Sequence, residues 1–199
     1  MFTVDTRPRR GVVGELEYPE EWLIGWASIL YRWLGATIDR RPGAFMDRRF
    51  DLKIYPTDDN RGLHGTYSSD TDGSATITLY PESDHCEALT TLLHELAHAW
   101  SEPVHIGKAH CQAWRAVYLD LFEYLTGIRI HARMAERWLR AHGARPTFGC
   151  RQDRFRANAL DRAVRTQLCA LDDAGLLSIE GSQTHIIAKA GVNAFKVQR

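Results

Sequence analysis

The sequence predicts an α+β fold in which a small sheet is followed by helices. Three short alternating segments between residues 50 and 80 are bounded by turn residues, and apolar residues recur at helical spacing on both sides of them. Hydrophobic residues make up 44% of the 199-residue chain, which is enough for a packed core, and the formal net charge is zero. The overall charge therefore gives no reason to expect a nucleic-acid or membrane partner.

The N-terminal region is expected to begin with a loose arm, because residues 1–14 carry three arginines and little apolar content. A helix is predicted from residue 20 to about residue 38. Apolar side chains recur there every three or four positions, at Leu23, Trp26, Ala27, Leu30, Trp33 and Leu34.

Three strands are predicted next, at residues 50–55 (FDLKIY), 64–68 (HGTYS) and 75–80 (ATITLY). The turn-rich SDTDGS segment joins the second strand to the third, and Pro81 ends the sheet. We expect a small antiparallel sheet.

Two helices should follow the sheet. Asp84 and Glu87 stand at capping-box spacing, which predicts a helix over about 85–101. A second apolar stripe predicts a helix over 110–126, closed by Gly127.

The remaining chain is divided by a change of composition at Arg145-Pro146. A third helical run is predicted over about 131–142, before this boundary. Beyond it we expect a helix at about 157–173 and a hairpin made of LLSIEG and THIIAK. The predicted domains are residues 1–145 and a small C-terminal region, 146–199.

The segment HELAH carries the strongest functional signal. His94 and His98 are four residues apart, so a helix places both imidazoles on one face, where two nitrogens can reach one zinc ion. Glu95 points about 100° round the helix. It is better placed as a general base for water at the open coordination position than as a ligand.

A catalytic zinc needs a third protein ligand. We favour His110, because it shares a predicted helical stripe with Trp114, Val117 and Leu121 and should face the same interior as HELAH. The alternatives are Glu102, His105 and His131. Cys111 is expected to be a small buried side chain rather than a ligand.

The stretch HELAHAWSEPVHIGKAHCQAW resembles the SprT-like metallopeptidases, the Spartan-related family, over residues 20–126. Its motif residues are His94, Glu95, His98, His110 and Trp114. The resemblance implies a minimal zincin-like fold and a zinc-dependent peptidase that in some members acts on DNA-bound proteins. Small phage and actinobacterial metallohydrolases are similar at the same motif. This chain departs from the family in having Cys111 where glycine is usual, and in having no four-cysteine ribbon.

Substrate contacts are less defined. Side chains that could stabilise the oxyanion of the reaction are His64, Tyr67, His105, Tyr118 and His131. By resemblance, HGTYS or ATITLY would bind an extended peptide as an edge strand.

Other functions remain open at this stage. From Arg145 onward there are nine Lys/Arg against five Asp/Glu, and a helix followed by a hairpin resembles part of a winged helix, so DNA contact is one alternative. A solvated charged face is the preferred interpretation. A DNA-associated or regulatory protein with a structural zinc, and a hydrolase of non-peptide amides, are the competing functions.

The expected setting is the cytoplasm. The N-terminus lacks the apolar run of a signal peptide, no segment is apolar enough to cross a membrane, and the four cysteines form no CxxC pair. We expect free thiols, one zinc per chain and a protein or peptide substrate.

Overall fold

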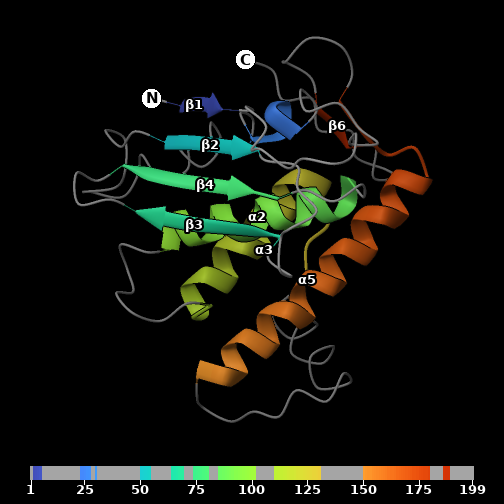
Figure 1. The fold of residues 1–199 in the computed structure, drawn as a ribbon. Coiled ribbons are helices and arrows are strands. Elements are labelled where there is room, and N and C mark those ends of the chain that lie inside the picture. Colours follow the sequence, from blue (N-terminus) through green and yellow to red (C-terminus); the bar gives the residue numbers. More distant parts are fainter. Residues whose placement is uncertain are drawn as a thin grey trace, which may run out of the picture. The chain divides into compact units, whose positions relative to one another are not determined.

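The computed structural model describes residues 2–5, 23–27, 30, 50–54, 64–69, 74–80, 85–101, 110–130, 150–179 and 186–188. Within them the protein is α+β, as predicted (Figure 1). The chain packs as two compact units, Met1–Ala99 and Trp100–Arg199. The domain boundary expected at residue 145 lies among residues outside the described ranges and stays a prediction.

The first unit contains a four-stranded sheet. Its strands are β1 (Phe2–Asp5), β2 (Phe50–Ile54), β3 (Gly65–Ser69) and β4 (Ala75–Leu79), and their order across the sheet is β1-β2-β4-β3. All three strands predicted between residues 50 and 80 are therefore present.

The expected antiparallel arrangement is wrong for two of the three strand pairs. β3 pairs with β4 in antiparallel fashion, but β2 runs parallel to β4 and to β1. Antiparallel neighbours can be joined by a short turn, and only a few residues separate β3 from β4 in the sequence, whereas parallel neighbours need a long crossover. Residues 6–49 separate β1 from β2 in the sequence, and β3 comes between β2 and β4. The sequence does not record which strands such crossovers bring together.

The expected loose N-terminal arm is also wrong for its first residues. Residues 2–5 form β1, with Phe2 opposite Phe50 and Asp5 opposite Lys53. An edge strand needs only backbone hydrogen bonds on one side, so a short segment with a weak alternating pattern can still join the sheet.

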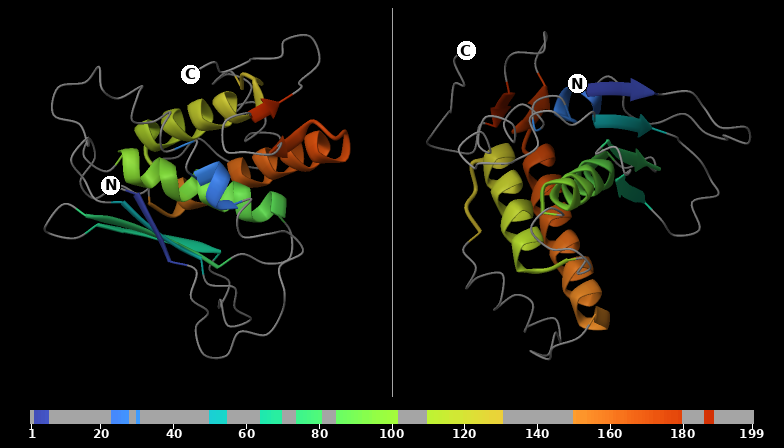
Figure 2. Two further views of the ribbon diagram at one scale, coloured as in Figure 1. Left: turned by 90° about the horizontal axis from the view of Figure 1, so that it is seen from above. Right: turned by 90° about the vertical axis from the view of Figure 1, so that its left-hand side faces the viewer.

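Helix α2 (His85–Ser101) covers one face of the sheet, as the two views of Figure 2 show. Residues 23–27 are helical within the predicted first helix. The core of this unit is apolar and almost completely excluded from solvent, and comprises Leu23, Trp26, Leu30, Leu52, Ile54, Ile77, Leu79, Leu89, Leu92, Leu93 and Leu96. The burial of these side chains supplies the main stabilisation of this unit.

The second unit is built on two helices that contact each other, α3 (Gln112–Thr126) and α5 (Cys150–Asp173). α5 begins earlier than expected and ends where predicted. The predicted hairpin is present as β5 (Leu177–Ile179) paired antiparallel with β6 (Ile186–Ala188). The helical run predicted at 131–142 lies outside the described residues, and contact with DNA stays a prediction.

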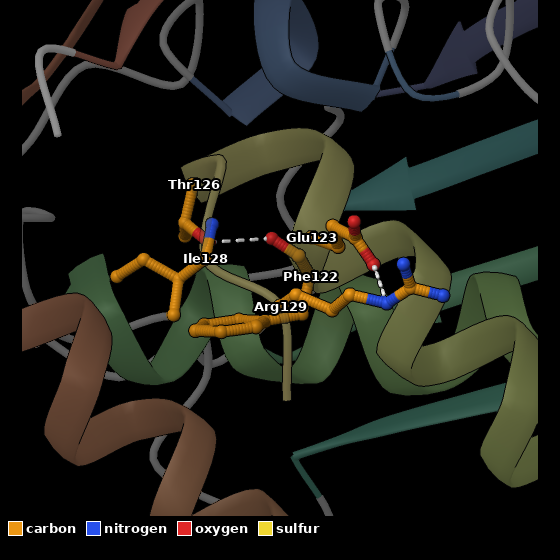
Figure 3. A network of polar contacts seen from close by, with 5 residues as sticks. All are labelled: Phe122, Glu123, Thr126, Ile128 and Arg129. Atoms are coloured by element: carbon orange, nitrogen blue, oxygen red, sulfur yellow. Dashed lines mark hydrogen bonds and ion pairs between the residues drawn. The ribbon is translucent and has the colours of Figure 1, made fainter. Parts of the chain in front are cut away.

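Helix α3 ends at Gly127, as predicted. Gly127 has φ 69°, a left-handed conformation that costs glycine little, and its N–H donates to the carbonyl of Glu123 at 2.7 Å. Figure 3 shows the groups around this end: the Thr126 hydroxyl donates to the Phe122 carbonyl at 2.7 Å and accepts from the N–H of Ile128 at 3.1 Å. Arg129 and Glu123 form an ion pair there, with Nε and Oε2 3.6 Å apart.

Helix α5 closes in a similar way. The N–H of Leu176 donates to the carbonyl of Leu171, and the N–H of Gly175 donates to that of Asp172, which is the Schellman pattern with Gly175 at φ 66°. No helix among the described residues is long and apolar enough to cross a membrane.

Candidate metal centre

His94 and His98 lie one turn apart on α2 and their rings converge. The two Nε2 atoms are 3.2 Å apart, and the ring centroids are 5.0 Å apart. Two nitrogens that bind one zinc at about 2.0–2.1 Å with a tetrahedral angle are separated by about 3.3 Å. The pair predicted from the sequence is therefore spaced as a shared metal requires, and both residues are half-buried rather than sealed in the core.

Glu95 lies between these histidines in the sequence and is buried, with 7% of its surface exposed. Its Cγ lies near the backbone of β3, because a Cβ placed on Gly65 would be 3.1 Å from it. Burying a carboxylate at such a position costs considerable free energy, unless polar partners or a metal-bound group replace the hydrogen bonds that it loses with water.

His110 is positioned differently from the prediction. It was expected in the first turn of α3, but the helix starts at Gln112, with Cys111 as its N-cap. His110 precedes the cap with φ 61° and is the only non-glycine residue with positive φ in the part of the chain that the structure describes. This left-handed backbone costs on the order of 1–3 kcal/mol, and such conformations concentrate at functional sites. The prediction for His110 was wrong because the spacing of apolar residues in a helix does not show at which residue the first turn begins.

The structure brings the three predicted ligands together. His94, His98 and His110 each offer one ring nitrogen, and these atoms lie within 4.8 Å of one another. All three side chains are half-buried. Three imidazoles are a donor set that suits a zinc ion with one open position, so the residues fit the metal expected from the sequence.

No protein-family model, curated protein or solved structure matches this chain.

The resemblance to the SprT-like family therefore stays a prediction, and the interpretation of the site rests on its own geometry. That geometry consists of a histidine pair on one helix, a third histidine ahead of the next helix and a buried glutamate.

The structure separates the candidates for oxyanion stabilisation. Tyr67 on β3 stacks on His98, with ring centroids 6.4 Å apart and planes inclined by 12°. His64 instead pairs with Glu87 in the first turn of α2, with Nδ1 and Oε1 3.2 Å apart. Tyr118 is fully buried, and burial together with the negative charge of Asp161 raises its pKa. Among the described candidates, Tyr67 is the one adjacent to a predicted ligand.

Several predicted alternatives cannot be compared with His110, because Glu102, His105 and His131 lie outside the described residues. Cys111 is half-buried rather than buried, and it is not part of the histidine cluster. Among the described residues, neither Cys86 nor Cys169 forms a disulfide.

Two features of the site were missed in the sequence. One is Gly65, whose lack of a side chain lets β3 approach α2; a glycine inside a strand pattern is a signal of close backbone approach. The other is the pair of His64 and Glu87, which links the residue before β3 to the start of α2. Nothing local in the sequence indicates that pair.

Proposed function

We propose that this protein is a zinc-dependent metallohydrolase that cleaves peptide bonds, with His94, His98 and His110 as metal ligands and Glu95 as general base. The observation that carries the proposal is the convergence of three histidine nitrogens within 4.8 Å, two of them on the helix that also carries a buried glutamate. A surface helix with incidental histidines would not place a carboxylate in the core beside them.

The donor set favours a catalytic over a structural metal site. Structural zinc sites are closed by four protein ligands, usually with cysteine among them, whereas catalytic sites use three and leave one position open. No cysteine belongs to the histidine cluster among the residues that the structure describes. When bound, zinc supplies a Lewis acid that polarises a carbonyl group and makes nearby water more acidic.

Glu95 performs the proton transfers in this proposal. Its carboxylate takes a proton from the attacking water and then delivers it to the nitrogen of the leaving amine, so that one residue serves as base and then as acid. Burial beside the β3 backbone limits the rotamers of the side chain and keeps its carboxylate close to α2.

The sheet offers one place for an extended substrate. Of the two strands that the resemblance suggested, β4 lies between β2 and β3, and β3 is at the edge of the described sheet. An edge strand has free backbone groups that an extended peptide can pair with. We propose that β3 binds the substrate and that the phenol of Tyr67, beside His98, donates a hydrogen bond to the developing oxyanion.

The proposal is tested with the full-length protein, reconstituted with zinc, on a mixed library of fluorogenic peptides. Glu95→Gln keeps the shape of the side chain but removes the base, so we expect kcat/KM to fall by about 10²–10⁴-fold while the zinc content stays at one per chain. Glu87→Gln, in the first turn of the same helix, is the matched control and should retain activity.

Two results would contradict the proposal. If Glu95→Gln hydrolysed peptides as fast as the parent, the site would not be catalytic, and a structural zinc would be the better interpretation. If the parent bound zinc but cleaved no peptide in the library, peptide hydrolysis would be wrong and non-peptide amides would be the next substrates to assay.

A further inference from the structure

The backbone groups of β3 point alternately to its two sides. In an antiparallel pair, one residue directs its N–H and C=O to the partner strand, and the next residue directs them away from it. The register of β3 and β4 pairs Gly65 with Leu79. One residue earlier, His64 stands opposite Tyr80, whose N–H donates to the His64 carbonyl at 2.9 Å. The backbone of His64 therefore points to the β4 side, and that of Gly65 points away from it.

Gly65 presents its N–H and its carbonyl at the outer side of the sheet. β3 is the last of the four strands in the order β1-β2-β4-β3, so no strand among the described residues pairs with this side. Gly65 is half-buried rather than sealed in the core. Backbone groups at a sheet edge can pair with an extended peptide, which then adds as a further strand.

The position of Gly65 next to α2 brings this edge close to the proposed general base. A Cβ on Gly65 would lie 2.6 Å from Cγ2 of Thr91 and 3.1 Å from Cγ of Glu95. The φ of Gly65 is not positive, so lack of space rather than backbone conformation accounts for a glycine here. Tyr67 lies two residues further along β3 and faces the same side, where it stacks on His98.

We infer that Gly65 is the backbone anchor of the substrate: its N–H and carbonyl pair with one residue of an extended peptide, and the bond that is hydrolysed is one of the two peptide bonds of that residue. Neighbouring strands lie about 4.8 Å apart, so the anchored residue is one strand spacing from Gly65 and beside Glu95. The inference rests on the proposed function and deepens it, because it specifies which substrates fit.

The anchor excludes one class of substrate residue. The residue opposite Gly65 must donate its own N–H to the Gly65 carbonyl, and proline and N-methylated residues have no N–H to donate. The residues on either side of the anchored one direct their N–H groups away from β3, so they tolerate N-methylation. The expected substrates are therefore extended peptides with an unsubstituted amide at one defined position next to the cleaved bond.

The inference is tested from the substrate side, because Gly65→Ala would disturb packing as well as binding. The probe is the fluorescein-labelled member of the peptide library that binds most tightly to full-length, zinc-loaded Glu95→Gln, measured by fluorescence anisotropy. Each residue of this probe is N-methylated in turn. Binding without cleavage keeps the chemical step out of the comparison, even when the methylated nitrogen belongs to the cleaved bond.

We expect N-methylation of a single residue to raise the dissociation constant by about 10-fold, because a backbone hydrogen bond is lost and its acceptor is left unpaired. N-methylation of the residue before or after it is the matched control and should change binding by less than about twofold. The parent protein should cleave the unmodified probe at one of the two peptide bonds of the sensitive residue, as located by mass spectrometry.

Hydrogen exchange of the protein provides a second readout. In Glu95→Gln without peptide, the N–H of Gly65 should exchange rapidly, while the N–H of Thr66, which points to β4, should be protected. Saturation with the probe should slow the exchange of Gly65 by about 10-fold or more. A change of stability alone would slow both amides together.

The inference is overturned if no library member binds, if N-methylation has the same effect at every position, or if Gly65 is already protected without peptide. Cleavage more than one residue from the sensitive position would also overturn it. Failure of the proposed function looks different. A probe that binds and protects Gly65 but is not cleaved by the parent would refute peptide hydrolysis and leave Gly65 as the anchor of a bound peptide.

Discussion

Gly65 of β3 lies close to Thr91 of α2, the helix that carries two of the histidines. A Cβ atom on Gly65 would lie 2.6 Å from Cγ2 of Thr91, and 3.1 Å from Cγ of Glu95 and 3.2 Å from the Thr78 carbonyl oxygen. Real Cβ atoms do not approach other heavy atoms as closely as 2.6 Å, so β3 has no space for a side chain at this point. The separation of α2 from β3, and with it the position of Glu95, therefore depends on a residue without a side chain.

Gly65→Ala is expected to destabilise the protein and to disturb the site. The added methyl group must displace Thr91 or push the strand away from α2, and overpacking of this kind costs about 1–3 kcal/mol. Urea unfolding followed by circular dichroism measures the loss. Because Glu95 moves with α2, we also expect kcat/KM on peptides to fall.

Thr91→Ser provides the matched rescue, since it deletes the Cγ2 atom that clashes first. The double variant should recover part of the stability lost in Gly65→Ala, with the contact to Glu95 limiting the recovery. Strictly additive effects of the two substitutions would show that this contact is not the source of the loss.

Zinc should stabilise the folded protein through the histidine cluster. A ligand that binds only the folded state at a hundred times its dissociation constant adds about 2.7 kcal/mol to the free energy of unfolding. We expect an increase of that order when zinc is added to chelator-treated protein. His98→Ala should remove most of this increase, because it deletes one of the two Nε2 atoms that lie 3.2 Å apart in His94 and His98. Calorimetric melting with and without zinc measures the difference.

His64→Ala is the control for that experiment, because His64 pairs with Glu87 and is not part of the cluster. It should lower the melting temperature of the metal-free protein slightly and leave the increase caused by zinc intact. Equal loss of the zinc effect in both variants would mean that the metal binds elsewhere.

Alkaline pH should destabilise the protein through Tyr118. Burial and Asp161 raise the pKa of Tyr118 in the folded state. Above about pH 10 the unfolded chain releases the phenol proton while the folded chain keeps it, so the free energy of unfolding falls as pH rises. The fall from one such group is at most about 1.4 kcal/mol per pH unit.

Tyr118→Phe removes this contribution, so the decline in stability above pH 10 should become less steep. The pKa of Tyr124 is raised by partial burial alone, so the decline in stability should become less steep in Tyr124→Phe too, but by a smaller amount. The slopes come from denaturant unfolding at a series of pH values. Identical slopes for Tyr118→Phe and the parent would contradict the assignment.

The C-terminal end of α3 allows a simple test of backbone conformation. Gly127 has φ 69°, and a Cβ added to it would meet nothing within 4 Å. Gly127→Ala should therefore cost only the strain of a left-handed alanine, about 1–2 kcal/mol in thermal unfolding. Gly175→Ala, at φ 66° and equally unobstructed, should cost a similar amount. A cost near zero at both positions would show that the two helix ends relax.

Local features of the chain were predictable from the sequence. The bounds of α2 were predicted correctly, and so were the end of α3 at Gly127, the end of α5 and the segments of β2, β3 and β4. Each depends on the spacing of apolar residues or on a terminating glycine or proline, which are properties of a few consecutive residues. The convergence of His94 and His98 follows from the same local geometry, because residues four apart on a helix share a face.

Longer-range features were decided only by the tertiary structure. They include the parallel pairing of β1 and β2, the close approach of Gly65 to α2, the left-handed backbone of His110 and the effect of Asp161 on the pKa of Tyr118. Each one joins residues far apart in the chain or depends on packing around a single residue. By itself the sequence determined which side chains are candidates for a metal site, since helical spacing is set by bonds between near neighbours. Their arrangement into a site was decided by contacts that form only when distant segments pack together.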